Sequence, residues 1–316
     1  MLNTDDVDVV ILTYRTSRLA IDAAHSALDN NPGSITVVDN FSQDESSVLL
    51  KKEIGPFARI IFLDQNYGFG GGNNRGAQSG SRPLLLLMNA DIKLYPDALL
   101  NMVKVFNTDE RAGVVVPALN YPDQRMQPSA YLFIRPLRII KIMMGLDKLA
   151  EKLNCNFLAG NVDCLHNNDY SGPIESPYGS CMLIRRRAFE DVGGFDENFF
   201  IYCEETDLAL RLTKKRWKIF RDADARAIHN HGASANQNPA NFYILMQESV
   251  RIYSKKHFNL LGRLAVFIFS ILGIALRLVF FLGLHNKRMK YWAGLGVWLG
   301  WQKSVDPRKK ADSNVI

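Results

Sequence analysis

An unbroken apolar run that ends in a carboxylate constrains the fold more than any other feature of this chain. Residues 84–88 are four leucines and a methionine, and they lead directly into Asn89-Ala90-Asp91. A run this apolar is typical of a strand buried on both faces of an α/β sheet. Ligands of such sheets bind beyond the carboxyl ends of the strands. Asp91 is therefore a candidate ligand for Mg²⁺ or Mn²⁺ carrying a diphosphate, although a lone aspartate there can also simply cap the next helix.

The order of the predicted elements favours an α/β fold with a mostly parallel sheet flanked by helices, because strands alternate with helices at the pitch of βαβ units. The predicted strands are 7–13, 35–40, 58–64, 83–91, 113–119, the first part of 179–189, and 218–231. The predicted helices follow the first strand to about residue 28, the glycine-rich turn within 66–79, and residue 95 to about residue 106.

Charge and hydropathy divide the chain into two regions. Residues 251–316 carry twelve lysines and arginines against two aspartates, a net charge of +10, whereas residues 1–250 carry a net charge of −4. We expect a domain over 1–250 that carries the candidate site and a basic, hydrophobic helical region over 251–316. Within the first domain, residues 120–176 should form an insertion that shapes the side of the site where a second substrate, the acceptor of a transferred group, would bind. A nucleic-acid enzyme would place its basic surface beside its site. The basic tail instead favours contact with anionic lipid headgroups.

An apolar segment within this tail has about the length needed to cross a bilayer. Residues 264–284 contain one charged residue, Arg277, and basic and aromatic residues lie on either side. Such a segment is buried in protein or in lipid. Because Arg277 is costly in a spanning helix, both a spanning and an in-plane arrangement stay open.

The cysteines and the first residues indicate a reducing compartment. The four cysteines form no Cys-x-x-Cys pair, and the chain enters a predicted strand without a basic, apolar, cleavable leader. Together with the basic tail, this predicts a protein at the cytoplasmic face of a membrane.

The ends of the first two predicted strands carry polar groups suited to a nucleotide. Thr13-Tyr14-Arg15 ends the first strand and Asp39-Asn40 ends the second, so both groups should open onto one edge of the sheet. A tyrosine face can stack on a base, and a carboxylate can accept the N3–H of uracil or thymine. Asp39 by itself can also be an ordinary turn residue.

A glycine-rich segment, residues 66–76, resembles a phosphate cradle but lacks the Gly-Lys-Ser/Thr ending of a Walker loop. It follows the third predicted strand, whereas a dinucleotide fingerprint follows the first. Its glycines, including Gly68, could let the backbone approach a ligand, and Asn73, Asn74 and Arg75 offer polar contacts.

An acidic cluster and a late histidine complete the candidate site. Glu204, Glu205 and Asp207 lie where a loop meets a predicted helix, and their mutual repulsion should raise at least one pKa, as a general base requires. The same cluster can serve only to complement the helix dipole. His229, at the end of the last apolar strand, can ligate a metal through a neutral imidazole.

Taken in order, six motifs resemble those of the family 2, GT-A-fold glycosyltransferases, and most closely the bacterial rhamnosyltransferases of cell-surface polysaccharide (O-antigen type) assembly. The motifs are TYR, VVDNFSQDES, NYGFGGGNNRGA, LLLLMNADI, YGSCMLIRRRAFEDVGGFDENFFIYCEETDLALRL and AIHNHGAS, and they span residues 7–234.

The resemblance implies roles for individual residues. Asp91 would ligate a divalent cation on the donor diphosphate, and Asn89 stands where many relatives have the first Asp of a DxD motif. Glu205 would be the base, at a position where Asp is commoner. His229 would complete the metal site, with His231 as the alternative. Family members invert the anomeric configuration, which implies one in-line displacement.

These expectations combine into one hypothesis: transfer of L-rhamnose from dTDP-L-rhamnose to a polyprenyl-linked or other saccharide at the cytoplasmic face of a bacterial inner membrane, with Glu204 or Asp207 orienting the acceptor. A same-fold transferase using UDP-GlcNAc, UDP-galactose or another UDP-hexose is an alternative. A non-catalytic membrane scaffold is a second alternative. A chain without catalytic activity should have lost at least one of Asp39, Asp91, Glu205 and His229, and all four are present. A soluble nucleotidyltransferase would need a basic or P-loop-like signature near the first strand, and the sequence has none.

Overall fold

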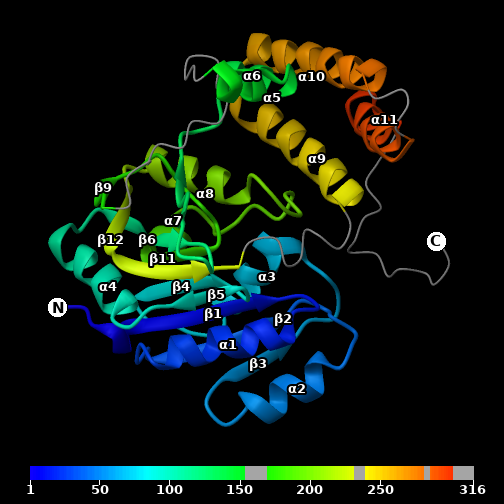
Figure 1. The fold of residues 1–316 in the computed structure, drawn as a ribbon. Helices are drawn as coiled ribbons and strands as arrows, with labels where there is room; N and C mark the ends of the chain where they lie inside the picture. The colour runs from blue at the N-terminus through cyan, green and yellow to red at the C-terminus, as the bar shows by residue number, and fades with distance from the viewer. Residues whose placement is uncertain (154–168, 231–238, 281–284, 302–316) are drawn as a thin grey trace. The chain divides into compact units, whose positions relative to one another are not determined.

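The computed structural model describes residues 1–153, 169–230, 239–280 and 285–301. The described chain divides into two compact units (Figure 1). Unit 1 contains Met1–Tyr131, Asp163–Glu197 and Glu204–Asn236, and unit 2 contains Leu132–Val162, Asn198–Cys203 and Gln237–Ile316. The sequence-based boundary at residue 250 differs from this division, since part of the expected 120–176 insertion and the start of the helix at 239 group with the tail.

Unit 1 is built on a ten-stranded sheet in the order β3-β2-β1-β4-β11-β6-β12-β5, with β7 paired to β6 and β9 paired to β12. The strands are β1 (Val7–Thr13), β2 (Ser34–Asp39), β3 (Arg59–Phe62), β4 (Leu84–Asn89), β5 (Ile92–Leu94), β6 (Ala112–Asn120), β7 (Met126–Gln127), β9 (Gly172–Pro173), β11 (Cys181–Arg185) and β12 (Lys218–His229). A separate two-stranded sheet pairs β8 (Ala130–Tyr131) with β10 (Ser176–Pro177).

The sheet is parallel in one half and mixed in the other. Strands β3, β2, β1 and β4 run parallel to one another. β11 is antiparallel to both neighbours, β4 and β6. The predicted parallel α/β sheet is therefore confirmed for its first half, while the insertion of β11 could not be deduced from a run of apolar residues that fits either direction.

The described part of unit 1 contains six helices, which are joined to its strands by short connections. They are α1 (Ser17–Leu28), α2 (Ser46–Glu53), α3 (Gly68–Ala77), α4 (Ala98–Thr108), α7 (Arg186–Asp191) and α8 (Glu204–Lys214), and a 3₁₀ turn at Thr4–Asp6 precedes β1. Helix α2 and the short strand β5 were not predicted from the sequence.

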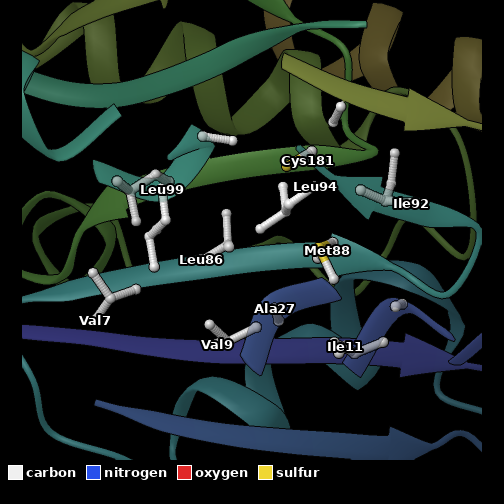
Figure 2. Packing of buried hydrophobic residues seen from close by; sticks show 14 of the residues in the cluster. Val7, Val9, Ile11, Ala27, Leu86, Met88, Ile92, Leu94, Leu99 and Cys181 are labelled. Atoms are coloured by element: carbon white, nitrogen blue, oxygen red, sulfur yellow. The ribbon is translucent and has the colours of Figure 1, made fainter. Parts of the chain in front are cut away.

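The core lies where α1 and α4 pack on one face of the sheet (Figure 2). Side chains at every second position of β1 and β4 point to this face, as the alternation of a strand requires, among them Val7, Val9 and Leu86. Both faces of these strands are buried, which explains why residues 84–88 are apolar without alternation.

Unit 2 is helical. It contains α5 (Pro136–Met143), α6 (Leu146–Leu153), α9 (Pro239–His257), α10 (Leu260–Phe280) and α11 (His285–Leu299). The basic and apolar stretch at 134–153 forms two helices and not one, because Gly145 adopts a left-handed conformation with φ +73° between them. Among the described residues, α10 alone is long and apolar enough to cross a membrane. Residues 281–284 of the predicted apolar segment lie outside the described chain.

Candidate active site

Strand pairing brings Asp91 and His229 together. β5 runs antiparallel to the end of β12, with His229 opposite Ile92, and the main-chain N–H of Asn230 donates to the carbonyl of Asp91 at 3.0 Å. The side chains then meet with His229 Nε2 at 3.4 Å from Asp91 Oδ1. The expected convergence of these two distant residues is present in the structure. His231, the alternative ligand, lies outside the described residues.

Gln127 holds the other nitrogen of the same imidazole. His229 Nδ1 lies 2.9 Å from Gln127 Nε2 and 3.2 Å from Oε1, and both side chains are buried. With the ring proton on Nδ1 and donated to Oε1, the lone pair of Nε2 is directed toward Asp91. A partner of this kind fixes the tautomer and orientation of a metal-ligating histidine. The Tyr178 ring packs edge-on against the imidazole, 5.8 Å between centroids.

The chemistry of this pair fits a divalent cation. Two ligands on neighbouring corners of an octahedral Mg²⁺ or Mn²⁺ are about 3 Å apart, close to the 3.4 Å between Asp91 Oδ1 and His229 Nε2. Within the described ranges, no group of three or more His, Cys, Asp or Glu side chains converges as a metal site. Asp91 and His229 are the two ligands that the described residues offer here, and a diphosphate and water could occupy further positions. Asn89, two residues before Asp91, is held through its main-chain N–H, which donates to the carbonyl of Ser180 at 2.8 Å.

The acidic residues at the start of α8 differ in environment. Glu204 is buried, and its Oε2 has no hydrogen-bond partner among the described residues. Burial, with the nearby charge of Glu205, raises the pKa of Glu204 well above its usual range. Burial also raises the pKa of Glu205, against the opposing effect of hydrogen bonds that include Thr206 Oγ1 at 3.2 Å. The predicted pKa increase within this cluster is present in the structure.

Glu205 faces the segment that also contacts the histidine. A Cβ placed on Gly179 would lie 3.3 Å from Glu205 Cβ, so the two residues are in direct contact. The preceding residue, Tyr178, packs on His229. The chain at Tyr178–Gly179 therefore touches the imidazole with one residue and the candidate base with the next.

Asp207 lies in a different setting from Glu205. It is fully buried and forms an ion pair with Arg211 Nε at 2.7 Å, while Arg211 Nη1 donates to the carbonyl of Val192 at 2.6 Å. These contacts give Asp207 a structural role in joining α8 to the end of α7. Its part in orienting an acceptor stays a prediction.

The predicted nucleotide residues lie at the carboxyl ends of β1 and β2. The Asp39 carboxylate accepts hydrogen bonds from the main-chain N–H of Ser42 at 3.0 Å and from the Ser42 hydroxyl. Burial raises the pKa of Asp39, and these hydrogen bonds partly offset that increase.

The end of β1 is joined to the same turn. Ser42 Oγ accepts the main-chain N–H of Arg15 at 2.8 Å, and the Arg15 guanidinium lies 5.3 Å from the Tyr14 ring. Thr13 accepts the N–H of Asn40 through its carbonyl at 2.9 Å, which completes this group.

The glycine-rich segment forms helix α3, and its glycines serve packing. A Cβ on Gly72 would lie 2.5 Å from the Leu12 side chain, and one on Gly76 would lie 2.3 Å from Val10, so only glycine lets α3 lie this close to β1. The start of the helix is fixed by Asn40, whose side chain donates to the carbonyl of Gly68 at 3.0 Å.

The polar side chains of α3 contact protein groups, but the buried Asn73 Oδ1 has no hydrogen-bond partner among the described residues. Asn74 donates to the Phe195 carbonyl at 2.9 Å and accepts the Phe195 N–H, and Arg75 pairs with Glu197 at 3.0 Å. Asn73 donates to the Phe69 carbonyl at 3.0 Å. The binding of a nucleotide by Gly68, Asn73 and Asn74 stays a prediction. In the structure, Asn74 positions the 193–197 loop, whereas Gly68 and Asn73 form their hydrogen bonds outside that loop.

Sequence reasoning missed Gln127 and Ser42. Ser42 follows Asp39 by three residues, a spacing typical of a turn closed by an aspartate side chain, so that signal was available. Gln127 carried no signal, because its role depends on a two-residue strand beside β6 that sequence periodicity does not reveal.

Comparisons with known proteins agree with this geometry. The glycosyl transferase family 2 profile matches residues 8–193, and the chain belongs to this family. The N-acetylglucosaminyl-diphospho-decaprenol L-rhamnosyltransferase of Mycobacterium tuberculosis is 26% identical over 79% of this chain and 84% of its own length. Rhamnosyltransferase WbbL of Escherichia coli is 26% identical over 64% of this chain and 74% of its own.

Two solved structures share the fold. GalNAc-T7, solved with UDP, GalNAc and Mn²⁺, has a TM-score of 0.56 at 14% identity over 80% of this chain, which spans 48% of that protein. The mannosyltransferase PcManGT of Pyrobaculum calidifontis, solved with GDP-Man and Mn²⁺, has a TM-score of 0.53 at 13% identity over 96% of this chain and 79% of its own. The chain is a glycosyltransferase of the GT-A fold and resembles the bacterial rhamnosyltransferases.

Proposed function

We propose that this glycosyltransferase transfers L-rhamnose from dTDP-L-rhamnose to a polyprenyl-diphosphate-linked saccharide at the cytoplasmic face of the membrane, with inversion at the anomeric carbon. The main support for this reaction is that one segment, Tyr178–Gly179, contacts both His229 of the proposed metal pair and the candidate base Glu205. The names of the mycobacterial and Escherichia coli relatives support rhamnose as the sugar and, for the mycobacterial protein, a lipid-linked acceptor.

The donor base would bind at the ends of β1 and β2. Tyr14 offers an aromatic face, and the buried Asp39 offers an acceptor for the N3–H that thymine and uracil share. Because Ser42 donates two hydrogen bonds to Asp39, the carboxylate is already oriented before a base arrives. Nothing in this contact separates thymine from uracil, so a UDP-hexose is the second candidate donor.

Asp91 and His229 would hold Mg²⁺ or Mn²⁺, and the Mn²⁺ in both solved structures supports this. When bound, the cation would offset the negative charge that develops on the departing diphosphate. Gln127 would keep the imidazole in the tautomer that leaves Nε2 unprotonated. The protein's contribution is therefore a fixed pair of ligands, one anionic and one neutral.

Glu205 would act as the general base. Its carboxylate accepts the proton of an acceptor hydroxyl, whose oxygen forms a bond to C1 of the sugar as the bond from C1 to the diphosphate oxygen breaks. A carboxylate whose pKa is raised by burial is a better proton acceptor near neutral pH than an exposed one. Glu204, which is more deeply buried, would adjust the charge beside the base and orient the acceptor.

The tail supports an acceptor at a membrane. Helix α10 spans 21 residues and is apolar apart from Arg263, Ser270 and Arg277, and the sequence from residue 249 to residue 305 contains no aspartate or glutamate. This combination suits a bilayer with anionic headgroups. A lipid-linked acceptor would then diffuse in the same membrane plane in which the enzyme is bound.

Mass spectrometry of products separates the candidate donors. Purified full-length enzyme with Mn²⁺ and an undecaprenyl-diphosphate-N-acetylglucosamine acceptor is given dTDP-L-rhamnose, UDP-GlcNAc or UDP-galactose in parallel. We expect a product heavier by one deoxyhexose from the first donor alone. Transfer of a hexose or an N-acetylhexosamine would replace rhamnose as the sugar. Absence of any transfer under these conditions would refute the proposed pairing of donor and acceptor.

A further inference from the structure

Helix α10 has one face packed against protein and one apolar face left open. Val266, Ser270, Gly273 and Ile274 are buried within unit 2. The opposite face carries exposed apolar side chains at four-residue spacing, which we call the α10 stripe: Leu264, Ile268, Leu272 and Leu276. This spacing places the stripe along one side of the helix for most of its length. So much aligned apolar surface marks an interaction site.

Helix α5 lies alongside the covered face of α10 (Figure 1). At one end, a Cβ on Gly262 would lie 3.0 Å from Pro136, and at the other end a Cβ on Gly273 would lie 2.1 Å from the carbonyl of Met143. Pro136 and Met143 are the first and last residues of α5. The whole of α5 therefore runs beside residues 262–273, in the same direction as α10.

Arg277 fastens these two helices together. Its guanidinium donates to the carbonyl of Ile142 at 2.9 Å, to the carbonyl of Met143, and to the carbonyl of Gly273 in its own helix at 3.0 Å. The last carbonyls of α5 have no partner within that helix, and a cation satisfies both them and the negative end of the helix dipole. This explains a charge within the long apolar part of α10 without assigning it to lipid.

The position of α5 bears on how α10 meets a membrane. α5 carries Arg138 and Lys141 between its two ends, so both lie beside the stretch of α10 between residues 262 and 273, inside the ends of that helix. If α10 crossed a bilayer along its length of about 31 Å, these cations would be drawn toward the hydrocarbon centre, where cations are disfavoured. If α10 lies parallel to the surface, they stay at headgroup depth.

We propose that α10 is an in-plane anchor whose stripe inserts into one leaflet of an anionic phospholipid bilayer, while α5 stays on the headgroup side. The lack of acidic residues between 249 and 305 gives the region the charge that such lipids attract. Trp292 and Trp301, both more than half exposed, suit the same interfacial depth. The inference rests on the proposed function only in taking the acceptor to be membrane-bound.

Insertion depth distinguishes an in-plane helix from a spanning one. A nitroxide-bearing amino acid is placed at position 264, 268, 272 or 276 of the full-length chain, and depth is read from collisions with oxygen and with a water-soluble nickel chelate on vesicles containing phosphatidylglycerol. We expect four nearly equal depths, about 5–10 Å below the headgroup boundary. A spanning helix would spread these positions over about 18 Å along the membrane normal, and that result would overturn the proposal.

Vesicle co-sedimentation identifies what covers the stripe. Ile268→Glu should lower partitioning of the full-length protein to phosphatidylglycerol-containing vesicles about tenfold or more. Val48→Glu, on an even more exposed apolar side chain of α2, should leave it unchanged. Vesicles of phosphatidylcholine alone should bind the native chain less. Unchanged partitioning of Ile268→Glu would overturn the proposal, and conversion of a dimer to a monomer by that variant would assign the stripe to a second copy.

These measurements use neither donor nor acceptor. A negative result in the donor panel therefore leaves the membrane proposal standing, and loss of the membrane proposal leaves the proposed reaction standing.

Discussion

The carboxylates at the two edges of the β1–β4 half of the sheet differ in whether arginine side chains form ion pairs with them. At the amino ends, the buried Asp8 is bound by Arg186 Nη2 at 2.8 Å, Arg82 Nε at 3.4 Å and Ser34 Oγ at 2.6 Å. At the carboxyl ends, Asp39 and Asp91 have no ion pair with lysine or arginine among the described residues, and His229 is the one basic side chain paired with Asp91. One edge neutralises its charge internally, whereas the other keeps acidic oxygens available for a ligand.

The largest expected effect is the loss of the base. Glu205→Gln should lower kcat by about 10²- to 10⁴-fold, because the amide cannot accept the acceptor's proton. Donor affinity should persist, measured by calorimetry with a dTDP-sugar. Because burial raises the pKa of Glu205, kcat/KM should fall as pH decreases through that raised pKa, at a higher pH than for an exposed carboxylate. Glu205→Asp is the matched control and should retain part of the rate. Full turnover in Glu205→Gln would move the base elsewhere.

Removing the acid at the opposite edge should act on stability. Asp8→Ala leaves Arg186, which is largely buried, without its carboxylate, and we expect a loss of about 3 kcal/mol in the free energy of unfolding. Urea denaturation measures it. The KM for the donor should stay near that of the native enzyme at temperatures where the variant is folded. A selective change in donor binding with unchanged stability would break the contrast between the edges.

Gln127 should affect metal affinity more than folding. Gln127→Ala removes the hydrogen bond that orients His229, and a loss of about 10- to 100-fold in Mn²⁺ affinity is expected in the presence of dTDP. Titration followed by electron paramagnetic resonance of free Mn²⁺ measures this without turnover. Gln127→Glu keeps an acceptor for the Nδ1 proton and should recover most of the affinity. Equal Mn²⁺ affinity in the alanine variant and the native chain would remove Gln127 from the site.

The smallest effect is expected at Glu204. Its pKa is raised in the folded state, so the folded chain binds more protons than the unfolded chain and stability should fall as pH rises above the ordinary glutamate range. Glu204→Gln removes this cost and should raise the free energy of unfolding by about 1 kcal/mol at pH 8, with the gain shrinking as pH falls toward 4. Thermal unfolding at both pH values tests the sign. A gain that is the same at both pH values would contradict a protonation effect.

The sequence predicted the order of most elements of unit 1 because its strands are apolar on both faces and polar residues in the turns separate them. Asp91 and His229 were each recognised as candidate ligands because both end apolar strands, and their meeting was expected because the resemblance to family 2 glycosyltransferases implies one shared metal site. The contacts of the glycine segment could not be predicted, since a run of glycines fits both a phosphate loop and a closely packed helix. Only the proximity of Leu12 and Val10 distinguishes the two.

The environment of Glu205 and the role of Gln127 depend on small paired segments far apart in the chain. β8 and β10 are two residues each, as is β7, and runs this short leave no periodicity to detect. Arg277 is a similar case, because its partners are carbonyls of a helix more than one hundred residues earlier. The sequence showed an unusual charge, and the structure supplies its physical reason.

The antiparallel ladder between β5 and β12 restricts how this enzyme can evolve. Because neighbouring residues of a strand face opposite sides, inserting or deleting one residue near the end of β12 would turn His229 away from Asp91. The pairing of β12 with β6 already shifts register between Asp222 and Arg226. Length changes should therefore accumulate at that irregular stretch and be absent from residues 227–229, a pattern that an alignment of diverged descendants would display.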